Sequence, residues 1–141
     1  MKKVIIKIKG TQGIDGENQV IELDTVGTMR KQDNTFVLSY KEGEMLGEKS
    51  VTTKLFVTDN NTAVMERSGD LRSRLVIEKG KRNNCCYASP YGNLMIGIFG
   101  EYIENALSDN GGSLKMGYSI DSDLVPISKN KVEITVREVS K

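Results

Sequence analysis

Residues 36–42, FVLSYKE, show the pattern that decides the fold. Every second residue is apolar, from Phe36 through Leu38 to Tyr40, and the next residue in this series is Glu42. Successive side chains of a β-strand point to opposite faces of the sheet. The stretch therefore predicts a strand whose buried face ends in a carboxylate.

The same alternation recurs along the chain, and segments rich in Gly, Asn and Asp separate the repeats at intervals of roughly 8–12 residues. It is clearest in residues 3–9, 20–30, 50–58, 113–120 and 131–138. Short strands at this spacing are typical of a sandwich or barrel. We therefore predict an all-β fold for residues 1–141: a single antiparallel, closed or nearly closed barrel of about eight to ten strands, with its two chain ends paired.

Three segments need separate interpretation. Gly27 interrupts the pattern of residues 20–30 and predicts a bend or a bulge there. Residues 101–109, EYIENALSD, fit either a helical turn or a strand. Residues 94–99, LMIGIF, are apolar on both faces. They form either a strand covered on both sides or one whose outer face meets a partner, such as a second copy of the chain in a homodimer.

Composition excludes several classes of function. The 20 basic and 19 acidic residues give a net charge of +1, and aromatic residues make up 6%, which argues against a nucleic-acid binder. The absence of histidine removes the Ser–His–Asp and Cys–His catalytic arrangements and histidine metal sites. No apolar run is long enough for a signal peptide or a membrane span. We therefore expect a cytoplasmic protein without cofactor, metal, nucleic-acid or membrane partner.

Two adjacent cysteines, Cys85 and Cys86, would point to opposite faces of a strand. A disulfide between neighbours is strained, and two cysteines cannot complete a zinc site. We expect two reduced thiols, with a dithiol redox switch as the alternative.

A second strand ends its apolar face with a charge of opposite sign. In residues 62–69, TAVMERSG, the alternate positions lead to Arg67. An isolated buried charge costs several kcal/mol, so we expect Arg67 to pair with Glu42 at the barrel mouth, near the hydroxyl of Tyr40 or Tyr118. The alternative is a solvated pair at the rim that only fixes strand register.

The order of these segments, from Val4 to Glu138, resembles the YwiB-like family, a domain family of unassigned function in low-GC Gram-positive bacteria. The most specific pieces are Tyr40 with Glu42, Arg67 with Gly69, Tyr91 with Gly92, and Gly112 with Tyr118. The resemblance implies a calycin-type, lipocalin-like barrel in the cytoplasm. It supplies no activity, ligand or catalytic residue.

Three functional interpretations follow. The first is a non-enzymatic barrel that binds a small, partly apolar ligand. The second is a barrel filled with side chains that acts through protein contacts. The third, and least favoured, is an enzyme with Glu42 as acid or base and Arg67 as an electrophilic clamp. The candidate ligand-binding residues are Phe36, Leu38, Tyr40, Glu42, Met65, Arg67, Met116 and Tyr118.

Overall fold

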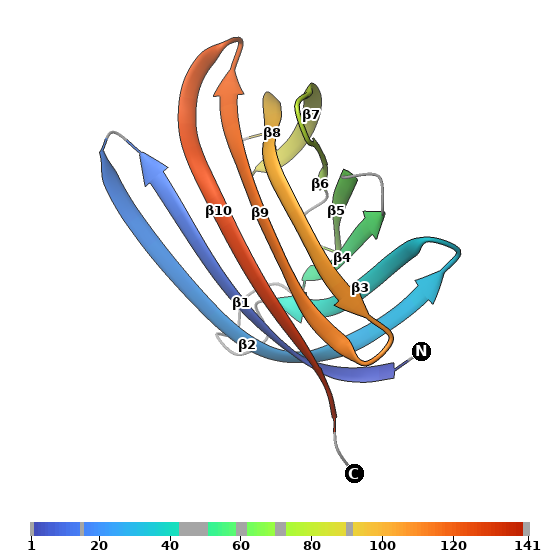
Figure 1. Cartoon of the computed structure of the whole chain (residues 1–141). Coiled ribbons are helices and arrows are strands. Elements are labelled where there is room, and N and C mark those ends of the chain that lie inside the picture. Colours follow the sequence, from blue (N-terminus) through green and yellow to red (C-terminus); the bar gives the residue numbers. More distant parts are fainter. Residues whose placement is uncertain are drawn as a thin grey trace.

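The computed structural model of the chain describes residues 2–14, 16–42, 51–58, 62–69, 73–89 and 92–139. Within these ranges the chain forms ten β-strands that curve into one barrel (Figure 1). The same ranges contain no helix that could cross a membrane. Tyr91, which belongs to the family resemblance, lies outside them.

The strands follow each other around the barrel in chain order, and each pairs antiparallel with its neighbours. They are β1 (Lys2–Ile14), β2 (Glu17–Gln32), β3 (Thr35–Glu42), β4 (Val51–Thr58), β5 (Thr62–Gly69), β6 (Ser73–Glu78), β7 (Arg82–Ser89), β8 (Gly92–Ser108), β9 (Gly111–Ser122) and β10 (Val125–Glu138). β1 also pairs with β10, from Val4↔Glu138 to Gly13↔Lys129. The predicted all-β antiparallel barrel and the pairing of the chain ends are thereby confirmed.

The two chain ends lie at the same end of the barrel (Figure 1). We call this end, where β1 begins and β10 ends, the lower end, and the opposite end along the strands the upper end. Between β3 and β6 the register sorts the inward-facing positions into three rows across the wall. The lower row is Phe36, Val57, Ala63 and Ile77; the middle row is Leu38, Leu55, Met65 and Leu75; and the upper row is Tyr40, Thr53, Arg67 and Ser73. The lower and middle rows are buried and wholly apolar, so polar side chains begin at the upper row.

β2 pairs with β3 over a shorter stretch than with β1. In the described part of the chain, β3 pairs with β2 only from Thr28 to Gln32, whereas β1 pairs with β2 from Lys2↔Met29 to Ile14↔Glu17. The hairpins β1–β2 and β9–β10 accordingly extend upward beyond β3 and β4 (Figure 1).

Gly27 lies where β2 leaves β3, and β2 curves along this part of its course (Figure 1). The register between β1 and β2 runs through Gly27 without a shift, so the glycine marks a bend and not a bulge. A Cβ atom at this position would lie 2.2 Å from the carbonyl oxygen of Ser39 and 2.9 Å from Cδ1 of Ile6. Glycine is therefore required because the neighbouring strand approaches so closely.

The structure also decides between the alternatives for the two ambiguous segments. Residues 101–108 continue β8, so a helical turn there is wrong; Ile103 pairs with β9 and is buried. In residues 94–99, Ile98 is fully buried, whereas Met95 and Phe99 are 63% and 40% exposed. This strand is therefore covered on one face only.

Candidate ligand cavity

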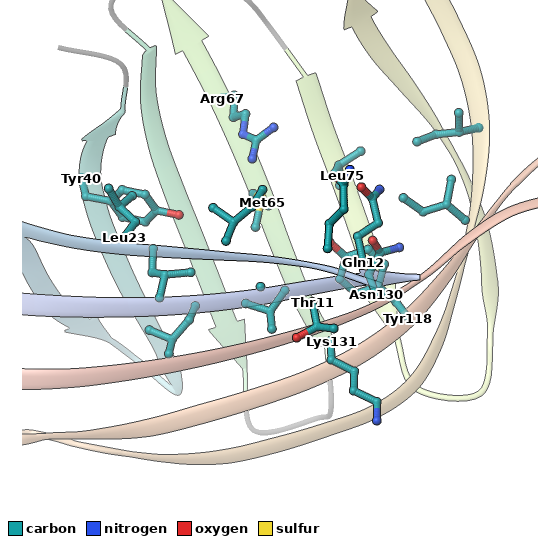
Figure 2. A pocket seen from close by; sticks show the side chains of 18 residues that line it. Thr11, Gln12, Leu23, Tyr40, Met65, Arg67, Leu75, Tyr118, Asn130 and Lys131 are labelled. Atoms are coloured by element: carbon teal, nitrogen blue, oxygen red, sulfur yellow. The ribbon is translucent and has the colours of Figure 1, made fainter. Parts of the chain in front are cut away.

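The upper half of the barrel contains a cavity of about 440 Å³ that is partly open to solvent (Figure 2). Its floor is apolar, because the lowest lining residues of five strands are aliphatic or thioether side chains. They are Ile8, Leu23, Met65, Leu75 and Ile134. A volume of this size is within the range of small-molecule sites, which are about 300–1,000 Å³.

Polar side chains converge above this floor from two sides of the barrel. Arg67 on β5 and Tyr40 on β3 belong to the upper row. On the other side, the register aligns a second set across β9, β10, β1 and β2, which we call the polar row: Tyr118, Asn130, Gln12 and Gln19. Figure 2 shows the guanidinium of Arg67 pointing into the space between Tyr40 and the side chains of Gln12 and Asn130.

The phenol of Tyr118 and the guanidinium of Arg67 influence each other electrostatically. Tyr118 is only 9% exposed, and this burial raises the pKa of its phenol, while the charge of Arg67 acts in the opposite direction. The phenol therefore remains protonated at neutral pH and can donate a hydrogen bond. The Nε atom of Arg67 is itself shielded from solvent.

Asn130 shows how the polar row is held in place. It is 8% exposed, and its Nδ2 donates a hydrogen bond of 3.1 Å to Oγ of the buried Ser128. A buried amide held in this way has a fixed orientation, which is what a specific polar contact to a ligand requires.

The structure separates the candidate residues into two groups. Tyr40, Met65, Arg67 and Tyr118 line the cavity together. The other described candidates belong to the packed core and do not line it: Phe36, Leu38 and Met116, which are 5%, 0% and 0% exposed.

The eighth candidate, Glu42, is the last residue of β3, where its backbone pairs with Val51. Its side chain lies outside the described part of the structure. The pairing of Glu42 with Arg67 therefore stays a prediction.

Sequence reasoning missed Gln12 and Asn130, although the necessary signal was present. The inward series of β1 continues beyond Ile8 through Gly10 to Gln12. The inward series of β10 likewise begins before Val132, at Asn130. Extending each apolar series by one or two alternate positions would have reached both residues.

On the outer wall, an ion pair joins β7 to β9 across β8. Nε and Nη2 of Arg82 donate hydrogen bonds of 2.9 Å and 2.5 Å to the two carboxylate oxygens of Asp121. This contact holds the pKa of Asp121 below its ordinary value. The guanidinium passes over Gly97, where a Cβ atom would lie 2.2 Å from Nη2. A glycine in β8 therefore makes room for the bridge.

The cysteines lie on opposite faces of β7, as predicted, and both are free. Cys85 is buried, and its Sγ accepts a hydrogen bond of 3.3 Å from the backbone N–H of Val76. Cys86 is exposed. Among the side chains that the structure describes, no group of three His, Cys, Asp or Glu residues could hold a metal ion.

The fold and the site together define a nearly closed antiparallel barrel that is packed at one end and hollow at the other. The family model described as "Domain of unknown function (DUF1934)" matches residues 6–134, and the chain belongs to this family. The crystal structure of the ywiB protein from Bacillus subtilis is similar, with a TM-score of 0.86 and 22% sequence identity over 99% of this chain and 93% of that one. This similarity supports the YwiB-like fold. No curated protein sequence matches the chain.

Proposed function

We propose that this protein is a cytoplasmic, non-enzymatic binding protein that holds a small, partly apolar ligand inside its barrel. The observation that carries the proposal is the 440 Å³ cavity, with an apolar floor below a few convergent polar groups. This combination is typical of small-molecule sites. The described part of the cavity wall contains no Asp, Glu, His or Cys, which favours binding over acid–base or nucleophilic catalysis.

Gly10 contributes to the hollow in the upper half of the barrel, because this position of the wall carries no side chain. It lies on the cavity wall in β1, between Ile21 of β2 and Val132 of β10. A Cβ atom at Gly10 would meet no atom within 4 Å. A larger residue could occupy this space, yet the chain leaves it open.

The same position supplies a variant that partly fills the cavity. Gly10→Val places a branched side chain in the open space, and valine is well suited to a strand. Lys9→Val is the matched control, because Lys9 is the preceding residue of β1 and is exposed. The measurement is native mass spectrometry of protein purified without denaturation. We expect a bound small molecule on the wild type and on Lys9→Val, and a clearly lower occupancy on Gly10→Val. Equal occupancy of Gly10→Val, or empty wild-type protein, would contradict the proposal.

A second candidate function is a protein contact through the outer face of residues 94–99, including a homodimer. Met95 and Phe99 on this face are exposed, and so are Leu124 and Val125 near the β9–β10 turn, at 73% and 66%. Contiguous exposed apolar residues often mark interaction sites. Sedimentation analysis of the wild type and of Met95→Glu tests this candidate. A wild-type dimer that Met95→Glu dissociates would support it, and a monomeric wild type would exclude the homodimer.

A further inference from the structure

We propose that the ligand is a small organic carboxylate with a compact apolar body, bound with its carboxylate between Arg67 and Tyr118. The apolar body would lie across the floor formed by Met65, Leu75 and the aliphatic residues of β1, β2 and β10. This inference rests on the proposed function and specifies the chemical class of the ligand.

The sign of the charge follows from the groups that the cavity wall presents. Arg67 and Lys131 are the described lining residues that carry a charge, and both are cationic. Figure 2 shows the long side chain of Lys131 extending away from the polar side chains of the cavity, whereas the side chain of Arg67 points toward them. The charge directed into the described part of the cavity is therefore positive.

The geometry of the polar groups favours a carboxylate over other acceptors. A guanidinium presents several N–H donors in a planar fork that matches the two oxygens of a carboxylate. This fork can hold a ligand oxygen while other N–H groups contact the protein. Tyr118 faces Arg67 from β9 with a buried, protonated hydroxyl, and Tyr40 lies in the same row as Arg67. A carboxylate between them would receive charge-assisted hydrogen bonds from opposite walls.

The volume of the cavity and the position of its floor limit the size and shape of the ligand's apolar body. At about 30 Å³ for each water-sized group, the 440 Å³ cavity holds about 15 such groups. Arg67 lies only one row above Met65, a separation of about 7 Å along the strand. The apolar body must therefore spread across the floor, so a ring or a short chain fits better than a long extended chain.

A set of similarly shaped probes with different head groups separates this inference from the proposed function. The probes are 4-phenylbutyrate, 4-phenylbutanol and 4-phenylbutylamine, measured by isothermal titration calorimetry on the wild-type protein. We expect the carboxylate to bind at least about tenfold more tightly than the alcohol and the amine. We also expect palmitate to bind more weakly than 4-phenylbutyrate, because its chain exceeds the volume of the cavity.

Variants of Arg67, the residue proposed to bind the carboxylate head group, provide a second test. Arg67→Gln should lower the affinity for 4-phenylbutyrate to that of the alcohol, and Arg67→Lys should retain part of the difference, since it keeps the charge and loses the planar fork. Lys129→Gln is the control, because it removes the same charge from an exposed position of β10 outside the cavity. If Arg67→Gln does not fold, the wild-type comparison decides alone.

The outcomes that overturn the inference differ from those that overturn the proposed function. Alcohol or amine binding as tight as that of the carboxylate would refute the carboxylate site and leave a small-ligand barrel standing. Palmitate binding as tight as that of 4-phenylbutyrate would refute the size limit. Failure of all the probes to bind at about millimolar concentration would refute both.

Discussion

Replacing Gly27 with alanine should destabilise the seam between β2 and β3. The added Cβ atom would lie 2.2 Å from the Ser39 carbonyl oxygen, whereas ordinary contact begins at 3.4 Å, so the strands must separate by about 1.2 Å. The second close neighbour, Cδ1 of Ile6 at 2.9 Å, belongs to a fully buried side chain and cannot move freely. Overpacking of this kind costs about 1–3 kcal/mol. At about 3 °C per kcal/mol for a chain of this size, Tm should fall by about 3–9 °C.

The control for this prediction is the same substitution at Gly10, which also lies on the inner face of the wall. No atom lies within 4 Å of a Cβ atom there, so Gly10→Ala should leave stability unchanged or raise it by up to about 1 kcal/mol. Urea unfolding and thermal melts of both variants give the comparison. Equal stability changes at Gly10 and Gly27 would show that the close approach of β3 to Gly27 is not real.

Three further predictions follow from the charged and phenolic groups. Burial raises the pKa of Tyr118 above its ordinary value of 10.0, so the contribution of its protonated phenol to stability is full below about pH 10 and is lost as the pH rises through the folded-state pKa. In urea titrations at increasing pH, the free energy of unfolding of Tyr118→Phe should therefore fall less steeply than that of the wild type, and an equally steep fall would refute this. Arg82 lowers the pKa of Asp121 below 3.8, so the contribution of the ionised carboxylate to stability is present above about pH 4 and is lost as the pH falls through the depressed pKa. Asp121→Asn should lack this loss of stability in acid, and an acid unfolding transition identical to that of the wild type would count against the bridge. For the predicted ion pair, the effects of Glu42→Gln and Arg67→Gln on unfolding should be non-additive, and strict additivity in the double variant would exclude coupling.

The alternation of apolar residues predicted which face of each strand is buried, and hence the fold. Phe36, Leu38 and Tyr40 face inward together, as do Met65 and Arg67. Alternation specifies a face because side chains reverse at each residue, and this holds regardless of how the barrel closes.

Alternation does not specify height within the barrel, and this explains the part of the site that was missed. Leu38 and Met65 share the middle row, yet only Met65 reaches the cavity. Which residues line a hollow depends on the side chains that cross the barrel from strands distant in sequence. Extending the alternation identifies Gln12 and Asn130 as inward-facing residues, but their alignment arises only when β1 closes on β10, and no local pattern contains that alignment.

The bridge between Arg82 and Asp121 was unpredictable for a related reason. Both residues lie on the outer face of ordinary strands, and they meet because β8 places a glycine between them. The sequence contains many charged residues on such faces, and only the register of three strands selects this pair.

The central claim is that the hollow upper half of the barrel receives a small molecule, and the methionine methyl groups test it most directly. Met65 lines the cavity, Met29 is buried away from it, and Met95 is exposed on the outer wall. In a ¹³C-methyl methionine spectrum titrated with 4-phenylbutyrate, the Met65 signal should shift and saturate, while those of Met29 and Met95 stay in place. A Met65 signal that does not respond, or a larger shift at Met95, would contradict the claim.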